Sequence, residues 1–569
     1  MEAGAHGITD PDLRSLLGRH WEWTLSRWPE LASSIGDRRF DERINDASLE
    51  GLEIRRRERV AYLAEARALP RKGLTPFEIE TLDMLIGELE ADIAVEVCES
   101  ETWALGVRQN AIASWNRLAT RHPVATEKDL RTYLVRVRQA PVRVRQEMDN
   151  LRRGLGAGRV TNRESLRRTL EMADAQLAKP PETWPVVTEV ADKLTLLPEA
   201  ERESFRRDLI AATADLVSAL RPYRALLADE ILPKAREGNR VGLVALPDGD
   251  RCYAARILQS LGAPRDPAEL HALGETELAR IHAEMRVLGK RLFGTDDLPT
   301  IFARLRSDPA LRFRTAEEVE AKAKSALDAA NAKVPQYFGK LPKSPCVIRR
   351  IPDYAAPFST IAYYEPPNPD GSKPGEYFVN VLAPETRPRF EAEVLAYHEA
   401  VPGHHLQIAI AYELPLPAIR KYGEYVAYVE GWGLYAERLA DEMGLYSGDL
   451  DRMGVLSYDS WRAARLVVDT GIHRLGWDRE TAEKFMLEQT PLAPNNVTNE
   501  VDRYINTPGQ ALGYKVGQLE ILRLREQARK ELGDRFSFPG FHDAVLGTGP
   551  TTLPVMGAAV RRWVEAARR

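Results

Sequence analysis

The segment from Tyr397 to Gln407 reads YHEAVPGHHLQ and places three of the ten histidines beside a glutamate. Many zinc hydrolases carry the pattern H-E-x-x-H on one helix, where two imidazoles four residues apart share a cation and the glutamate acts on its bound water. In this chain the fourth residue after His398 is Pro402, and the next histidines are His404 and His405. Because His398 and His404 would point about 240° apart on an ideal helix, they can share one ion only if the helix is distorted.

Pro402 and Gly403 supply a cause for that distortion. Proline removes a backbone N–H and clashes with the preceding turn, and glycine adopts backbone conformations that other residues avoid. We therefore predict a kinked helix with His398 and His404 as metal ligands and Glu399 as general base, and His405 stays open as the alternate ligand. The competing interpretation is a kinked core helix whose histidines are only hydrogen-bonded.

The third ligand is expected from the next helical segment. Glu430 lies in the apolar and aromatic stretch 425–437, where an unpaired carboxylate would be costly and metal coordination would remove that cost. A buried salt bridge is the alternative. Glu437 either supports the ligands or pairs with Arg438. Two imidazoles and one carboxylate with an open position favour one Zn2+ ion over manganese or cobalt.

Length and composition limit the remaining choices. A chain of 569 residues exceeds the size at which single cores stop growing. We expect an N-terminal helical region over 1–240 and a catalytic region over 241–569, joined in one continuous body. The net charge of −5 does not suggest a nucleic-acid partner, and without a long apolar run we expect no membrane contact.

The cysteines Cys98, Cys252 and Cys346 are odd in number and widely spaced. This spacing fits neither a disulfide framework nor a cysteine zinc site, so we expect a reduced compartment and a cytoplasmic protein.

Three short segments rich in β-branched and aromatic residues interrupt the helical pattern, at 346–351, 360–364 and 376–381. They predict a small antiparallel sheet next to the kinked metal-site helix. The metal-site helices together are expected over 388–440. An edge strand there could bind an extended peptide, with Asn380 adding a side-chain contact. The alternative for Asn380 is that it caps its own backbone.

The motifs H-E-A-V-P-G-H-H at 398–405 and E-G-W-G-L-Y-A-E at 430–437 resemble the bacterial domain-of-unknown-function 885 family. The similarity covers nearly the whole chain, and this family is placed with the zinc-peptidase superfamily. More distantly, the motif order is similar to carboxypeptidase Taq, angiotensin-converting enzyme and thimet oligopeptidase. That resemblance implies a large, mainly α, multi-helix body with a deep cleft beside a short sheet, ligands at His398, His404 and Glu430, and a base at Glu399.

The same analogy suggests roles for residues further along the chain. Tyr514 or His473 would stabilise the oxyanion, and Asp469, four residues before His473, would orient its imidazole. A substrate carboxylate would be held by Arg503, Gln510 or Lys515.

Together these observations predict a zinc metallopeptidase that hydrolyses short peptides or small amides. Two alternatives stay open, namely a metal-dependent enzyme of a non-peptide metabolite and a catalytically lapsed binding protein. We also leave a homodimer open.

Overall fold

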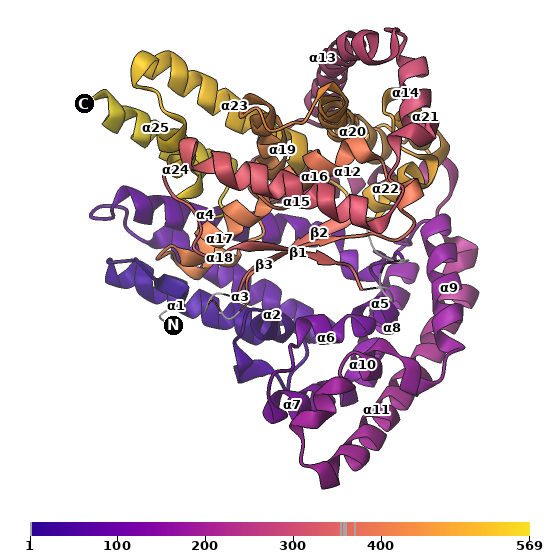
Figure 1. Cartoon of the computed structure of the whole chain (residues 1–569). Helices are drawn as coiled ribbons and strands as arrows, with labels where there is room; N and C mark the ends of the chain where they lie inside the picture. The colour runs from indigo at the N-terminus through magenta and orange to yellow at the C-terminus, as the bar shows by residue number, and fades with distance from the viewer. Residues whose placement is uncertain (1–2, 353–355, 357–360, 369–370, 372) are drawn as a thin grey trace.

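The computed structural model describes residues 3–352, 356, 361–368, 371 and 373–569, and the chain forms a mainly α-helical body around a small sheet (Figure 1). This agrees with the predicted fold class. Side-chain caps start many of the helices. Asp10, for example, accepts hydrogen bonds from the backbone N–H groups of Asp12 and Leu13, and Pro11 occupies the first helical position.

The first half of the chain contributes two groups of helices, at the bottom of Figure 1. The first group packs around Leu13, Leu16 and Leu85, and this core also takes in Ile419 and Val555 from the second half. The second group has its own core, between Leu105 and Ala235. The helices are α1 (Pro11–Arg27), α2 (Pro29–Ser34), α3 (Leu49–Ala68), α4 (Pro76–Val95), α5 (Ala111–Asn116), α6 (Leu118–Arg121), α7 (Glu127–Arg138), α8 (Ala140–Gly156), α9 (Arg163–Leu177), α10 (Pro185–Thr188) and α11 (Glu199–Ala225).

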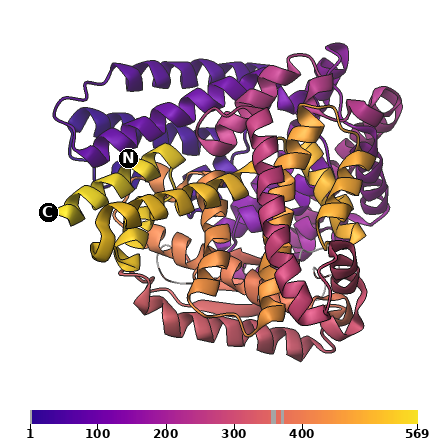
Figure 2. The same cartoon turned by 90° about the horizontal axis from the view of Figure 1, so that it is seen from above.

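The second half surrounds the sheet and carries the histidine motif. Viewed from above, α13 and α20 run side by side as two long neighbouring helices (Figure 2). The helices are α12 (Gly249–Leu261), α13 (Pro267–Phe293), α14 (Leu298–Ser307), α15 (Ala316–Lys333), α16 (Ala392–Glu399), α17 (His404–Glu413), α18 (Ala418–Tyr422), α19 (Val426–Glu442), α20 (Asp449–His473), α21 (Arg479–Gln489), α22 (Pro494–Asn506), α23 (Leu512–Leu532), α24 (Phe538–Leu546) and α25 (Leu553–Arg568).

The three strands are β1 (Cys346–Arg350), β2 (Ala362–Glu365) and β3 (Gly375–Val379). β3 lies in the middle, antiparallel to β2 and parallel to β1. The sheet is therefore mixed, and the prediction of an antiparallel sheet is wrong for the β1–β3 pair. Alternation within a strand indicates which side chains share a face, but it does not indicate the direction of the neighbouring strand. The predicted second strand began at Thr360, which lies outside the described residues.

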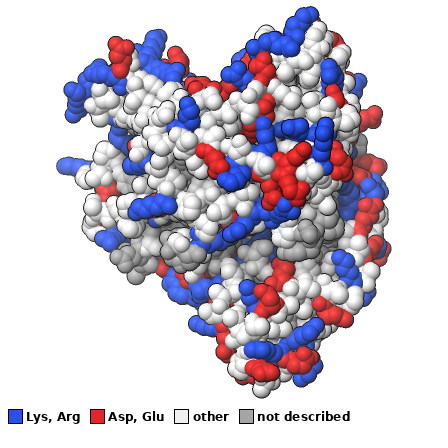
Figure 3. All heavy atoms as spheres, in the orientation of Figure 1, with Lys and Arg blue, Asp and Glu red and all other residues white. Residues whose placement is uncertain are grey.

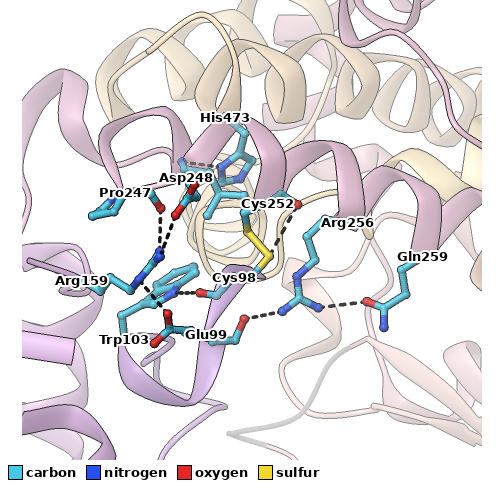
Figure 4. The surroundings of a disulfide bond; sticks show 12 residues. Cys98, Glu99, Trp103, Arg159, Pro247, Asp248, Cys252, Arg256, Gln259 and His473 are labelled. Atoms are coloured by element: carbon cyan, nitrogen blue, oxygen red, sulfur yellow. Dashed lines mark hydrogen bonds and ion pairs between the residues drawn. A yellow bond between two sulfur atoms is a disulfide. The ribbon is translucent and has the colours of Figure 1, made fainter. Parts of the chain in front are cut away.

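Cys98 and Cys252 form a disulfide, with an S–S distance of 2.08 Å and a sequence separation of 154 (Figure 4). The bond joins the end of a short turn of helix after α4 to the first turns of α12. Close by, Arg159 donates to the carbonyl oxygen of Pro247 and pairs with Asp248. The expectation that the cysteines stay unpaired is wrong for Cys98 and Cys252, while Cys346 is free, and the argument for a reduced compartment that depended on this expectation no longer holds.

The surface in the view of Figure 3 mixes basic and acidic side chains instead of collecting one sign of charge. Among the described residues, none of the helices combines the length and the apolar character needed to cross a bilayer.

Candidate metal centre

The histidine segment folds as two helices and not as one kinked helix. α16 ends at Glu399 and α17 begins at His404, and the Val401–Pro402 peptide bond between them is cis. A Cβ on Gly403 would lie 1.9 Å from the carbonyl oxygen of His398, so only glycine fits there. The predicted kink is thus replaced by a full break, because Pro402 cannot donate the hydrogen bond that would continue α16.

This break turns His404 toward His398. The two rings meet edge to face, with their centroids 4.7 Å apart. From α19, the Oε2 atom of Glu430 lies 3.6 Å from Nε2 of His398 and 3.5 Å from Nε2 of His404. Three candidate ligand atoms, one from each residue, all lie within 4.8 Å of one another. Ligands about 2.0–2.1 Å from a tetrahedral zinc ion would be roughly 3.3 Å apart, so this donor set fits zinc in both chemistry and spacing.

The sequence E-G-W-G of α19 explains how the helix reaches this position. Gly431 allows α19 to lie against the backbone of α23, where a Cβ would come 2.5 Å from Gly517. The indole N–H of Trp432 donates to the carbonyl oxygen of Pro402 at 3.0 Å and so holds the connection between α16 and α17. At Gly433 a Cβ would lie 2.6 Å from the ring of His398, so the glycine leaves room for the imidazole.

Glu437, one turn after Gly433 on α19, is 1% exposed. Its Oε1 lies 2.8 Å from Nδ1 of His398. A carboxylate at Nδ1 fixes the proton there and leaves Nε2 free to bind a cation. Glu437 was expected either to support the ligands or to pair with Arg438. The structure places its carboxylate against His398. Arg438 pairs instead with Asp459 and Glu284.

The electrostatics of the cluster favour a cation. Burial lowers the pKa of His398, but Glu430 and Glu437 outweigh it and raise that pKa to about 9. Burial likewise raises the pKa of Glu430, and hydrogen bonds from His398 and His404 more than offset it, so this pKa lies well below its ordinary value. Carboxylates that stabilise a protonated imidazole so strongly would also stabilise a divalent ion among the same atoms.

Glu399 is the last residue of α16 and is half-buried. Burial raises the pKa of its carboxyl; the two imidazoles lower it, the charge of Glu430 raises it, and the net change is upward. A carboxylate with a raised pKa is suited to accept and return a proton near neutral pH. Its position next to His398 therefore agrees with the role of a general base.

Tyr514 lies in the first turn of α23 and is 7% exposed. Burial raises the pKa of its hydroxyl, and the charge of Glu430 raises it further. Gly513, the residue before Tyr514, packs against Val426 and Ala427 at the start of α19. Gln510 hydrogen-bonds to Tyr514, and the guanidinium of Arg465 lies over the tyrosine ring at 4.2 Å. Since α23 packs along α19, Tyr514 and Glu430 lie on neighbouring helices.

His473 and Asp469 do not form the pair expected from their spacing. His473 accepts a hydrogen bond at Nδ1 from the backbone N–H of Leu243 and donates from Nε2 to the carbonyl oxygen of Tyr504. Asp469 accepts from the hydroxyl of Tyr253 at 2.7 Å and from the N–H of Gly509. We therefore remove His473 from the catalytic candidates, because neither ring nitrogen is available to an oxyanion. Among the residues that the structure describes, Asp469 hydrogen-bonds to Tyr253 and Gly509 and does not orient the imidazole of His473.

His405 turns away from the cluster, so the alternate ligand assignment is not supported. Its Nδ1 lies 3.0 Å from the hydroxyl of Tyr364, and its Nε2 lies 3.1 Å from the carbonyl oxygen of Ser344. Burial lowers the pKa of His405 to about 4. This residue ties α17 to the sheet.

Two of the expected substrate contacts are used inside the protein. The Lys515 ammonium is fully buried and lies 2.5 Å from Asp459 Oδ1, 2.8 Å from Gln518 Oε1 and 3.1 Å from Glu277 Oε2. All three of its hydrogens are thereby used, so Lys515 is not available to substrate. Asn380 is 1% exposed, donates to the carbonyl oxygen of Ala356 and accepts from the N–H of Leu382, which supports the backbone-capping alternative.

Two arginines that sequence reasoning missed lie near this site. Arg462 and Arg465, on α20, both lie against Trp461, with their guanidinium carbons 4.2 and 4.6 Å from the centre of its ring. Arg462 also lies 3.8 Å from Glu437. The available signal was the pattern W-R-A-A-R at 461–465, which places two charges one turn apart on a helix whose residues are mostly buried.

A cavity of about 880 Å³ lies between the N-terminal helices and the second half of the chain. Gln510 is part of its wall, together with Asn506 and Thr507. None of the three ligand candidates is in the wall. Gln510 lines this cavity and also interacts with the hydroxyl of Tyr514.

Comparison with known proteins gives a family and a fold. Residues 29–560 match the family described as "Bacterial protein of unknown function (DUF885)". The chain is similar to the crystal structure of the putative lipoprotein from Colwellia psychrerythraea, with 26% identity and a TM-score of 0.89 over 98% of this chain and 99% of that one. It also shares its fold with a putative lipoprotein of unknown function from Shewanella oneidensis, with 18% identity and a TM-score of 0.75 over 96% and 98% of the two chains. No curated protein sequence matches.

Proposed function

This chain belongs to the DUF885 family of bacterial proteins of unknown function, and we propose that it is a zinc-dependent hydrolase of peptide bonds that acts on short peptides. The observation that carries the proposal is the convergence of His398, His404 and Glu430, with Glu437 holding the far side of the His398 ring. Two imidazoles, one carboxylate and an adjacent unligated glutamate are the groups that hydrolytic zinc sites use. The order of these motifs along the chain supports a distant relationship with the zinc-peptidase superfamily.

When bound, zinc would polarise the scissile carbonyl and acidify the attacking water. Glu399 would accept the proton of that water and pass it to the departing amine, a role that its raised pKa favours. The hydroxyl of Tyr514 would donate a hydrogen bond to the oxyanion as it forms. That hydroxyl keeps its proton at neutral pH, because burial and the charge of Glu430 raise its pKa.

Short peptides are the proposed substrates because of the size of the cavity that Gln510 lines. A cavity of about 880 Å³ is within the range that binds small ligands and does not admit a folded protein. Gln510, in its wall, would guide such a peptide toward Tyr514.

The experiment begins with metal analysis of protein purified without chelator, for which we expect about one equivalent of zinc. The zinc-loaded protein is then given a panel of short peptides with free or blocked termini. We expect hydrolysis by the wild type, and a loss of about 10³-fold or more in kcat for Glu399→Gln with zinc retained. As a matched control, Glu442→Gln changes another carboxylate of this region, one that pairs with Arg525.

Other outcomes would point to the alternatives. Bound zinc without turnover of any peptide would favour an enzyme of a non-peptide metabolite. Less than about half an equivalent of zinc would favour a binding protein that has lost catalysis. Near-normal hydrolysis by Glu399→Gln would sink the proposed mechanism.

A further inference from the structure

One stretch of the N-terminal half carries three arginines and no acidic residue. Between Thr102 and Thr126 the sequence contains Arg108, Arg117 and Arg121, and it contains no Asp, Glu or Lys. All three arginines line the cavity of about 880 Å³. Arg108 and Arg121 are exposed, and Arg117 is half-buried. Three positive charges from one segment therefore border a single concave space.

The backbone of this segment is held by its own hydrogen bonds. Gly106 and Gln109 exchange two of them, at 3.1 and 3.0 Å, which places Arg108 in a tight turn. The side chain of Asn110 donates to the carbonyl oxygen of Gly106 at 2.8 Å. It also accepts from the N–H of Ala113 at 2.9 Å and so caps the start of α5. The turn that carries Arg108 is thereby fixed to the helix that follows it.

Apolar side chains anchor the rest of the segment in the core. Trp115 and Leu118 are 6% and 4% exposed and belong to the core of the second helical group. Arg117 lies between α5 and α6, which are both in the lower half of Figure 1, and its Nη2 donates to the carbonyl oxygen of Arg108 at 2.9 Å. Arg121 is the last residue of α6. The three guanidinium groups are thus carried by a segment that is tied to the core on one side and to the cavity on the other.

The carboxylates of the cavity wall are engaged elsewhere. Among the residues that the structure describes, the partners are Arg143 for Glu147, Arg153 for Glu101, Arg59 for Asp92 and the hydroxyl of Tyr425 for Glu88. The remaining one, Glu424, directly precedes Tyr425 and so belongs to the Glu88 side of the cavity. The three arginines consequently have no counter-charge within the described part of the chain.

Three like charges at one place favour the binding of an anion. Burial lowers the pKa of Arg117, and the positive charges of Arg121 and Arg108 lower it further. A concave wall with one sign of charge concentrates ions of the opposite sign. The guanidinium group binds phosphate and carboxylate oxygens through two N–H donors at once. A ligand with several negative charges would relieve the repulsion that a single charge leaves in place.

Arg503, which was expected to hold a substrate carboxylate, lies in a different environment. Its Nη2 is 3.8 Å from Oε2 of Glu500, and its guanidinium carbon is 5.7 Å from the rings of Tyr504 and Tyr514. Its Nε and Nη2 atoms are buried. The charge of Arg503 already has a carboxylate beside it, whereas the arginines of the cavity segment have none.

We propose that residues 106–121 form an anion-binding site of the cavity, in which Arg108, Arg117 and Arg121 hold a small ligand with two or more negative charges in one place. A cavity of about 880 Å³ has the size that small ligands occupy. The charges can belong to phosphoryl groups or to neighbouring carboxylates, and the experiment separates these two sources. The site uses none of the candidate metal ligands, so it goes beyond the proposed hydrolysis and holds whether or not a peptide bond is cleaved.

The first test is calorimetric titration of the full chain at low salt, where charge interactions are least screened. The probes are inorganic pyrophosphate and triglutamate with blocked termini, and trialanine with blocked termini is the uncharged control. We expect a Kd below about 1 mM for at least one charged probe and no binding of the control. The probe that binds more tightly identifies the phosphoryl or the carboxylate source.

Pyrophosphate also binds metal ions, so the titration is repeated with His404→Ala, which lacks a candidate metal ligand. The Kd of the probe should stay within about twofold of wild type, because the arginine segment does not include that histidine.

The second test removes two of the three arginines. Arg108→Gln with Arg121→Gln should weaken binding of the charged probe about 10- to 100-fold, since charge-assisted hydrogen bonds are lost at both positions. Both side chains are exposed, and thermal melts confirm that the variant is folded. Arg207→Gln with Arg523→Gln is the control. It removes the same charge from exposed sites whose ion-pair partners lie on their own helices, and it should change Kd less than about twofold.

Three results would overturn the site. They are absence of binding by both charged probes, equal affinity of the two double variants, and loss of binding in His404→Ala with normal binding in the arginine variant. The last result would place the anion at the metal centre. Peptide hydrolysis is measured separately, so failure of the anion site leaves the proposed hydrolase intact, and an inactive protein that binds the probe leaves the anion site intact.

Discussion

His398 and His473 are both buried histidines at the C-terminal end of a helix, yet their surroundings give them opposite properties. His398 faces Glu437 with Nδ1 and Glu430 with Nε2, and its pKa is raised to about 9 against the effect of burial. His473 meets one backbone N–H and one backbone carbonyl, and burial lowers its pKa to about 3. A histidine becomes a candidate ligand when carboxylates face its ring, and it becomes a structural connector when backbone groups do.

The largest expected effect follows from replacing a ligand histidine and comparing it with its neighbour. His404→Ala should reduce zinc to less than about a tenth of an equivalent, because only two ligands remain. His405→Gln should retain about one equivalent, since His405 faces Tyr364 and Ser344. Metal analysis of both proteins measures this. The reverse pattern would mean that His405 is the ligand and that the geometry of the break is wrong.

The next effect concerns stability at the other histidine. His473→Leu would leave the N–H of Leu243 and the carbonyl of Tyr504 buried without partners, at about 1–3 kcal/mol each. We expect a loss of about 4 kcal/mol in the free energy of unfolding, measured with denaturant, and unchanged zinc content in the folded protein. Loss of zinc with normal stability would contradict the structural role of His473.

Asp469, one turn before His473 on α20, predicts a pH-dependent effect on stability. Burial raises the pKa of Asp469 from its ordinary value of 3.8 to about 7. A raised pKa in an acid means that the folded protein retains the proton more strongly than the unfolded chain does. The stability from this group is therefore present below about pH 4 and is lost as the pH rises toward 7.

Asp469→Asn should remove that dependence while it keeps an oxygen for Tyr253 and Gly509. The measured quantity is the free energy of unfolding of the variant minus that of the wild type. This difference should be about 2–3 kcal/mol larger at pH 8 than at pH 5. An equal difference at the two pH values would show that Asp469 does not titrate with a raised pKa.

The smallest expected effect follows from changing Glu437, whose carboxylate contacts the candidate ligand His398. Glu437→Gln keeps the shape of the side chain but weakens its hold on Nδ1 of His398, and such changes cost about 10- to 100-fold in metal affinity. Competition with a chelator measures the affinity, with Glu442→Gln as the control. Unchanged affinity would mean that the Glu437 carboxylate contributes little to the metal site.

The sequence predicted local motifs of this protein better than contacts between residues that are far apart in the chain. The motif at 398–404 and the acid at Glu430 were identified because residue type and near spacing carry the signal of a metal site. Lys515 was misjudged because its charge alone says nothing of Asp459, Glu277 and Gln518, which come together only after α13, α20 and α23 pack. The Cys98–Cys252 bond was missed for the same reason, since the two cysteines are 154 positions apart in the sequence.

What the sequence alone determined is a helical chain with a short sheet and a set of candidate metal ligands, because helical periodicity and side-chain chemistry are local properties. The tertiary structure decided which of two adjacent histidines faces Glu430, that β1 runs parallel to β3, and that Arg117 lines a cavity between the two halves of the chain. Each of these depends on the distance and direction between atoms that lie far apart in the chain. Those distances are set by packing, where a single Cβ at Gly433 would be enough to displace the ring of His398.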